Sequence, residues 1–156
     1  MNKEIRHIGT LSGRILVFGG VYSNLQALES LQAVAKELEI APHNIICTGD
    51  IIGYCAQPEQ CVQVVRNWGI HCVAGNVEIQ LGNVEGDCGC NFAEGSQCDH
   101  LSKQWYPYAQ SKVTPKSLDW IRRLPKFLHF KYAGRQVAVV HGSYYNTSEF
   151  IFRSSN

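Results

Sequence analysis

The sequence lacks the features that mark nucleic-acid-binding, membrane and secreted proteins. Its 14 Lys and Arg residues nearly balance 13 Asp and Glu residues, and a net charge of +1 provides no footprint for nucleic acid or an anionic membrane. No apolar stretch approaches the roughly 20 residues that span a bilayer. Residues 1–7 also lack the apolar core of a signal peptide. We therefore expect a cytoplasmic protein with no membrane or nucleic-acid partner.

The cysteine content argues against a disulfide framework. The chain has seven cysteines, an odd number, and they are scattered through expected strands and helices. This pattern favours free thiols in a reducing compartment. A length of 156 residues, with 45% hydrophobic and 17% charged residues, is typical of one globular domain. We expect residues 1–156 to form that single domain.

The first half of the chain alternates short apolar runs with helical patterns. The runs at residues 15–18, 45–47 and 71–74 are typical of buried strands. Asn24 is placed to cap a helix after the first run, and Pro58 suits the first turn of a helix after the second. This order predicts a largely parallel sheet with right-handed crossovers.

The second half follows a different pattern. Residues 82–95 are rich in glycine and weakly periodic, which predicts a loop. A helix is expected over residues 97–110, and Thr114 followed by Pro115 predicts the start of another. The apolar runs at residues 127–130 and 137–140 indicate a hairpin with a short turn.

Polar residues stand where three of the apolar runs end. These residues are Asp50, Asn76 and His141. In an open α/β fold, strands that finish together deliver their terminal side chains to one rim of the sheet, so we expect the three to lie close together. A carboxylate, an amide oxygen and an imidazole form a suitable set of metal ligands.

Each of these residues also has a structural interpretation. An aspartate after Thr-Gly at a strand end is often a cap or turn residue, as Asp50 could be. Asn76 could cap a helix that begins near Val77. His141 could hydrogen-bond within a turn. The sequence leaves capping and metal binding open for these positions.

Four segments at the expected strand ends carry motifs in a defined order. They read ILVFGGVYSNLQAL at residues 15–28, CTGDIIGYCAQPEQCV at 47–62, VAGNVEIQL at 73–81 and VVHGS at 139–143. The order, spacing and residue identities of these segments resemble the motifs of the calcineurin-like metallophosphoesterases. The resemblance is to the small bacterial phosphodiesterase and dinucleoside-polyphosphatase-like branch in particular. The resemblance extends over about residues 14–152.

The resemblance implies both a fold and an activity. The fold is α/β, with a metallophosphoesterase-like β-sandwich core flanked by helices. The activity is hydrolysis of phosphomonoesters or phosphodiesters with metal-activated water, and the ligand is a small phosphorylated molecule. In this scheme Asp50 bridges two cations, while Asn76 and His141 bind the second one.

Three positions depart from the family's motifs. Gly20 stands where the family has its opening aspartate, and Tyr22 where it has the opening histidine. Neither glycine nor a neutral phenol replaces those ligands. Two dications with Asp50 as their only anionic ligand would repel each other, so we expect one Mn-, Fe- or Zn-type ion rather than a pair.

The third departure affects catalysis. Val77 stands where the family has a histidine that stabilises the phosphate or protonates the leaving oxygen, work worth ~10²- to 10⁴-fold in rate. Valine does neither, and no residue is assigned a catalytic role. The alternative to an enzyme is a non-catalytic descendant of the fold that binds a phosphate, a nucleotide or a protein.

The closing Gly-His-x-His motif of the family does not occur after Phe152. We therefore expect the C-terminal part of the fold to be missing from this chain. The missing strands would leave a sheet edge exposed, and a second copy or a partner chain could cover that edge.

Residues beside the expected metal ligands are candidates for substrate contact. Tyr22 either presents its hydroxyl to a phosphate or fills vacated metal space. The candidate substrate-binding residues are Tyr22, Asn24, Gly53 and Tyr54.

A separate zinc site is a further hypothesis. Cys88, Cys90, Cys98 and His100 place three thiols and an imidazole within thirteen residues, and such donors can bind zinc tetrahedrally. Free cysteines otherwise pack as small hydrophobic residues. Alternatively, this loop leans over the strand ends and supplies replacement ligands.

Overall fold

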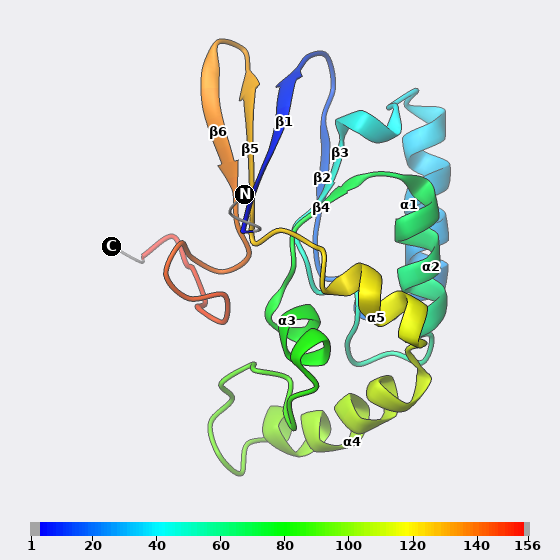
Figure 1. The fold of residues 1–156 in the computed structure, drawn as a ribbon, viewed down its shortest axis with the longest axis vertical. Coiled ribbons are helices and arrows are strands. Elements are labelled where there is room, and N and C mark those ends of the chain that lie inside the picture. The colour runs from blue at the N-terminus through cyan, green and yellow to red at the C-terminus, as the bar shows by residue number, and fades with distance from the viewer. Residues whose placement is uncertain (1–3, 155–156) are drawn as a thin grey trace.

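Two three-stranded sheets lie beside a group of helices in the computed structural model, which describes residues 4–154. In Figure 1 one sheet lies at the left, the other in the middle, and α1 and α2 at the right. The strands are β1 (Ile5–Leu11), β2 (Leu16–Phe18), β3 (Ile45–Cys47), β4 (His71–Cys72), β5 (Phe127–Tyr132) and β6 (Arg135–Val139). The helices are α1 (Leu25–Glu37), α2 (Pro58–Trp68), α3 (Asn76–Asn83), α4 (Gln97–Lys112) and α5 (Pro115–Ile121), with a 3-10 turn at Pro42–Asn44.

The β2-β3-β4 sheet is parallel and is built from the three apolar runs of the first half of the chain. Leu16 pairs with Ile45, and Cys47 pairs with Cys72. Both faces of β3 are covered, since Ile46 packs toward the other sheet and Cys47 packs toward the helices. All three residues of the strand are therefore buried. A strand covered on both faces reads as a continuous apolar run. The predicted parallel β-α-β-α-β order is confirmed.

The other sheet has the order β1-β5-β6 and includes a strand that the sequence reading missed. β5 and β6 form the predicted hairpin around Ala133 and Gly134, and β1 pairs in parallel with β5. The register of β1 shifts between His7 and Thr10, around Gly9 with a φ of +82°. This bulge breaks the two-residue alternation that identifies a strand in a sequence. β1 and β6 are the edges of this sheet in the described chain, and a partner that covers them remains a prediction.

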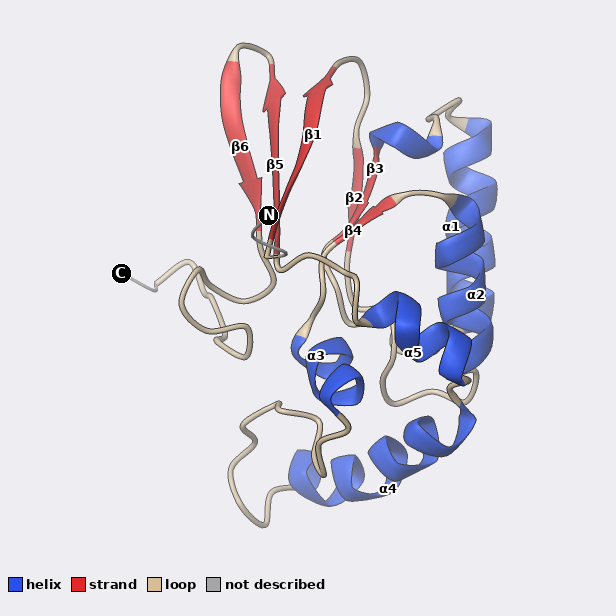
Figure 2. Ribbon diagram, viewed as in Figure 1, coloured by secondary structure: helices blue, strands red, loops and turns tan. Residues whose placement is uncertain are grey.

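A small core joins the two sheets. It contains Leu11, Ile46, Val73, Leu128 and Phe130, each at most 5% exposed. A larger core fills the space between the β2-β3-β4 sheet and the helices. Figure 2 shows the resulting layers, with strands in red and helices in blue. No helix within residues 4–154 combines the length and apolarity needed to cross a membrane.

Helices α1, α2 and α5 begin where the sequence predicts. Asn24 Oδ1 accepts a hydrogen bond from the backbone N–H of Ala27 at 3.0 Å and so caps α1. α2 begins at Pro58, and Thr114 caps α5 by accepting from the backbone N–H of Ser117. Because these signals are local, the sequence predicts them well.

A carboxylate on α2 stabilises the start of α5. Glu59 accepts hydrogen bonds from the Thr114 backbone N–H at 2.9 Å, the Thr114 hydroxyl at 3.1 Å and the Ser117 hydroxyl at 2.9 Å. Burial favours the neutral form, but these bonds and one from Gln63 outweigh it and hold the pKa of Glu59 below its ordinary value. The ionised side chain therefore contributes to folding stability.

We expect Glu59→Gln to reduce stability by about 1 kcal/mol at pH 7, because the amide nitrogen cannot accept these bonds. A depressed pKa contributes stability that is present above the unfolded value of 4.5 and lost as pH falls through the folded value. The difference between the two proteins should therefore shrink below pH 4. Urea denaturation at pH 7 and at pH 3.5 measures it, with exposed Glu37→Gln as the control. An equal difference at both pH values would contradict this account.

Candidate functional site

Loops from three strand ends meet at one rim of the β2-β3-β4 sheet. The backbone N–H of Tyr22 donates to the Asp50 carbonyl at 3.1 Å and ties the loop after β2 to the loop after β3. Gly49, with a φ of +99°, touches the loop after β4, since a Cβ there would lie 2.6 Å from Gly75 N. The same Cβ would lie 2.9 Å from His141 Nδ1. Only glycine permits this close approach.

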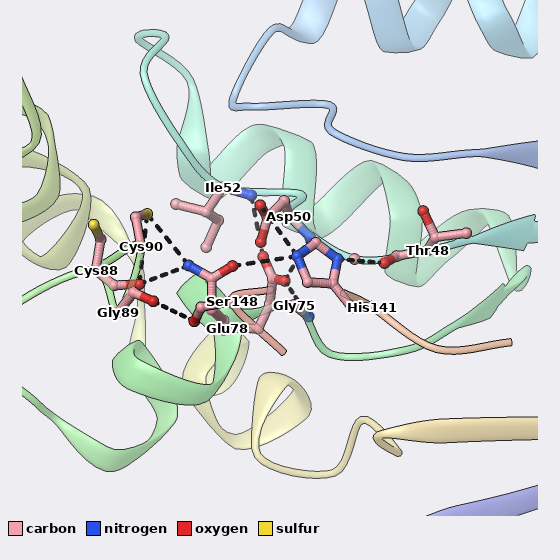
Figure 3. Close-up of polar contacts among 12 residues, drawn as sticks. Thr48, Asp50, Ile52, Gly75, Glu78, Cys88, Gly89, Cys90, His141 and Ser148 are labelled. Atoms are coloured by element: carbon pink, nitrogen blue, oxygen red, sulfur yellow. Dashed lines mark hydrogen bonds and ion pairs between the residues drawn. The ribbon is translucent and has the colours of Figure 1, made fainter. Parts of the chain in front are cut away.

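Asp50, Asn76 and His141 converge at this rim. His141 Nε2 lies 3.5 Å from Asp50 Oδ2 and 3.2 Å from Asn76 Oδ1. The other ring nitrogen, Nδ1, lies 2.7 Å from the Thr48 carbonyl oxygen (Figure 3). The predicted convergence of the three side chains is therefore present in the fold.

The hydrogen bonds around this group orient acceptor atoms toward one another. A carbonyl accepts only, so His141 Nδ1 carries a proton toward Thr48, and Nε2 of the neutral ring has a lone pair. The amide nitrogen of Asn76 donates to the Cys88 carbonyl at 2.9 Å, so its Oδ1 faces His141. His141 Nε2, Asn76 Oδ1 and Asp50 Oδ2 are therefore three acceptor atoms that face one another. Such a group requires either a proton on Nε2 or a cation.

Asp50 provides an independent test of whether a cation fits. Its residue is 8% exposed, and its buried Oδ1 makes no hydrogen bond of good geometry, although the Val77 backbone N–H lies near the carboxylate. Burial raises the pKa of Asp50, and the neighbouring His141 and the Val77 backbone N–H oppose that rise. A buried carboxylate with so few hydrogen bonds is costly unless positive charge lies near it. The donor set of Asp50, Asn76 and His141 therefore fits one divalent cation.

The same residues do not provide for a second cation. Within residues 4–154 no three His, Cys, Asp or Glu side chains form a group that could hold a metal ion. The first set thus consists of two such side chains and one amide oxygen. The number of ions, like their identity and presence, remains a prediction.

The structure decides against two of the structural interpretations. Gly75, not Asn76, is the N-cap of α3, and the Asn76 side chain makes no capping hydrogen bond. His141 contacts Thr48, 93 residues away in the chain, rather than a neighbour in its own turn. Both side chains instead face the strand ends.

Glu78 is a buried residue of the site that the sequence reading did not assign. It is 1% exposed, and its carboxylate accepts from the backbone N–H groups of Asp50 at 2.8 Å, Ile52 at 3.2 Å and Gly75 at 2.9 Å. Burial, and then the charge of Asp50, raise the pKa of Glu78 to about 7. The sequence did contain a local signal for Glu78, because a glutamate three residues after a helix cap commonly accepts a hydrogen bond from the backbone N–H of the cap residue.

Tyr22 occupies the space above Gly20. A Cβ at Gly20 would lie 2.4 Å from Cε2 of the Tyr22 ring and 2.8 Å from its hydroxyl oxygen. The Tyr22 ring is edge-on to the Tyr54 ring, with 5.0 Å between the ring centroids. The centroids of the Tyr54 and Trp105 rings are 5.1 Å apart. Burial raises the pKa of Tyr22, so the phenol stays neutral. This geometry favours the interpretation that Tyr22 fills vacated space beside Gly20 over the one in which its hydroxyl is presented to a phosphate.

The four candidate substrate-binding residues differ in what they expose. Asn24 uses its side-chain oxygen to cap α1. Gly53 is buried, and its N–H donates to the Ser23 hydroxyl at 3.1 Å. Tyr22 and Tyr54 are 37% and 48% exposed as whole residues, so they offer the most surface for a ligand. Substrate contact by any of the four remains a prediction.

The structure does not bring together the four residues of the separate zinc site. Cys88 is buried, whereas Cys98 is exposed on α4, and the two do not join Cys90 and His100 in a metal-binding group among the described residues. The loop does lean toward the strand ends, as the alternative proposed. Cys88 and Cys90 reach Asn76 there, but as hydrogen-bond acceptors for its amide nitrogen.

Solved structures share this arrangement of sheets and helices. A metallophosphoesterase from Sphaerobacter thermophilus matches with a TM-score of 0.61 and 24% identity. A hypothetical protein from Pyrococcus horikoshii OT3 matches with a TM-score of 0.72 and 21% identity, and a candidate diadenosine tetraphosphatase with 0.62 and 15%. This chain has the metallophosphoesterase fold. The predicted fold class is confirmed.

The chain spans little more than half of these metallophosphoesterase-fold structures. The three matches cover 90–91% of this chain but 52%, 60% and 55% of theirs. An uncharacterized protein of Methanocaldococcus jannaschii is 39% identical over 62 residues, which are 40% of this chain and 25% of that protein. No protein-family profile matches the chain.

Proposed function

We propose that this chain is a metal-dependent hydrolase of small phosphomonoesters or phosphodiesters, with one Mn-, Fe- or Zn-type ion at Asp50, Asn76 and His141. The observation that carries the proposal is the meeting of three acceptor atoms from these side chains around His141 Nε2. The metallophosphoesterase fold supports the reaction class.

Each ligand has a distinct role in this proposal. Asp50 supplies negative charge from a buried position. The Thr48 carbonyl holds the proton of His141 on Nδ1 and leaves Nε2 free to bind. A bound divalent cation polarises a phosphoryl oxygen and lowers the pKa of water. The exposed rings of Tyr22 and Tyr54 provide apolar surface for the organic part of the ligand.

A non-catalytic binding role is the second candidate, and two observations favour it. Val77 is 2% exposed and offers no proton donor where the family has its histidine. The Tyr22 ring lies against Gly20, in the space where the family's opening aspartate would stand. A chain with both changes could retain a phosphate or nucleotide near one cation without hydrolysing it.

Asp50→Asn tests the metal site that both functions share, because it removes the charge and keeps the shape. We expect manganese affinity, measured by isothermal titration calorimetry, to fall at least ~100-fold, because the only anionic ligand is lost. Hydrolysis of bis-p-nitrophenyl phosphate and p-nitrophenyl phosphate with manganese should fall to background. Asp119→Asn, on an exposed position of α5, is the matched control.

The outcomes distinguish the two proposals. Wild-type protein that binds manganese but hydrolyses neither ester would favour the binding role. Unchanged manganese affinity in Asp50→Asn would contradict the metal site itself.

A further inference from the structure

Three arginines line one small cavity that lies apart from the candidate metal ligands. Arg6 belongs to β1, Arg66 to the last turn of α2, and Arg123 to the connection between α5 and β5 (Figure 1). The cavity has a volume of about 280 Å³, and none of the three candidate metal ligands lines it. These segments are far apart in the chain, so folding alone brings the three arginines together.

The positive charge of this small cavity is not neutralised by the part of the chain that the structure describes. Among residues 4–154, no aspartate or glutamate lines the cavity, and none of its three arginines takes part in an ion pair. Arg122, outside this cavity, does pair with Asp119 at 3.2 Å. The C-terminal end of α2 places about half a negative charge near Arg66, which three guanidinium groups exceed. The small cavity therefore attracts anions.

Arg66 has a buried hydrogen-bond donor that lacks an acceptor. Its Nη1 atom is buried and has no hydrogen-bond partner among the described residues. Burial of a charged donor without an acceptor is costly, so such a group calls for an explanation. A cation in the last turn of a helix interacts favourably with the helix dipole, which explains the charge of Arg66 but supplies no acceptor for Nη1. An oxyanion in the small cavity does supply one.

The other two arginines are exposed and are linked to each other. Arg6 Nη2 donates a hydrogen bond to the Arg123 backbone carbonyl at 3.1 Å. This bond uses one of the several N–H donors of the Arg6 guanidinium, so the others remain available. Arg6 and Arg123 are exposed, whereas Arg66 is half-buried. An anion can therefore enter from solvent past the exposed pair and reach Arg66.

We propose that Arg6, Arg66 and Arg123 form a binding site for a phosphate group, either free or carried by a small organic molecule. A guanidinium group binds two oxygens of a phosphate at once, and three such groups match a doubly charged tetrahedral anion better than a carboxylate. A larger cavity of about 1290 Å³ shares Arg6, Arg123 and Leu124 with the small one, so it can hold the organic part of a phosphorylated ligand. This site needs no metal and does not rest on the proposed hydrolysis.

The test titrates inorganic phosphate into the whole chain by isothermal titration calorimetry, in Tris chloride at constant ionic strength, after chelating resin has removed metals. We expect saturable binding of one phosphate per chain. Arg66→Gln, Arg6→Gln and Arg123→Gln should each weaken it at least ~10-fold, because each removes a charged donor. Arg122→Gln is the matched control, since Arg122 lines only the larger cavity, and it should change the affinity by less than about 2-fold.

Circular dichroism checks the fold of each variant, and the variants of the exposed Arg6 and Arg123 decide the outcome if Arg66→Gln does not fold. Phenyl phosphate distinguishes the two sources of the group: tighter binding than inorganic phosphate indicates a phosphorylated organic ligand, and equal or weaker binding indicates free phosphate. Wild-type protein without saturable binding, or an equal loss of affinity in Arg122→Gln, would overturn the proposal. Because the experiment contains no metal, its failure would leave the proposed function in place.

Discussion

Gly20→Asp will destabilise the protein, and Tyr22→His in the same chain will reverse most of that loss. A Cβ at Gly20 would lie 2.4 Å from the Tyr22 ring, and the φ of +64° at Gly20 is unfavourable for a side chain. We expect the single variant to lose about 2 kcal/mol because Tyr22 must leave its contact with Tyr54. Histidine is smaller and leaves room for the carboxylate.

The double variant should also gain a metal ligand pair. Gly20→Asp/Tyr22→His restores the two residues of the family's opening motif next to Asp50, so we expect two manganese ions per chain instead of one. A second cation stabilises charge on the phosphate, and hydrolysis of bis-p-nitrophenyl phosphate should rise by ~10²-fold or more.

Gly20→Ala/Tyr22→His is the matched control, because it has the Cβ without the carboxylate. Stability is read from thermal denaturation, and metal content from elemental analysis of dialysed protein. An equal metal content in the double variant and its control would show that this space no longer accepts a cation. An undiminished stability in Gly20→Asp would contradict the contact between Gly20 and Tyr22.

Glu78→Ala is expected to cause the largest loss of stability, about 3–5 kcal/mol. The change leaves the buried N–H groups of Asp50, Ile52 and Gly75 without their acceptor, and each unsatisfied group costs about 1–3 kcal/mol before water or relaxation compensates. For a chain of this length the loss corresponds to a fall in Tm of about 10 °C or more. Manganese affinity should fall as well, because the loop that carries Asp50 loses its attachment to α3.

Thermal denaturation of metal-free protein isolates the structural part of this effect. Glu37→Ala, at an exposed position near the end of α1, is the control and should change stability by less than about 0.5 kcal/mol. A Tm within a few degrees of wild type for Glu78→Ala would mean that the three N–H groups find water or other acceptors.

The sequence predicts elements well where the signals are local. Asn24, Pro58 and Thr114 mark helix starts that the structure reproduces, because each signal depends on a few neighbouring residues. β1 was missed because its apolar positions are three residues apart and its bulge shifts the register. Its partner, β5, is more than one hundred residues away, so no local pattern indicated the pairing.

The sequence likewise predicts some features of the candidate site and not others. Strand ends placed Asp50, Asn76 and His141 at one rim, and the structure brings them together. Their orientation depends on long-range acceptors, the carbonyls of Thr48 and Cys88, which no spacing in the sequence indicates.

The sequence by itself determined the fold class, the starts of the helices and the strand ends that hold the candidate ligands, because hydrophobic period, caps and motif order are written along the chain. The tertiary structure alone decided that Glu78 ties the loops together, that Tyr22 covers Gly20, and that the Cys88 carbonyl and the Cys90 thiol reach Asn76. Those contacts join segments brought together only by folding, and their energies depend on burial and distance rather than on sequence neighbours.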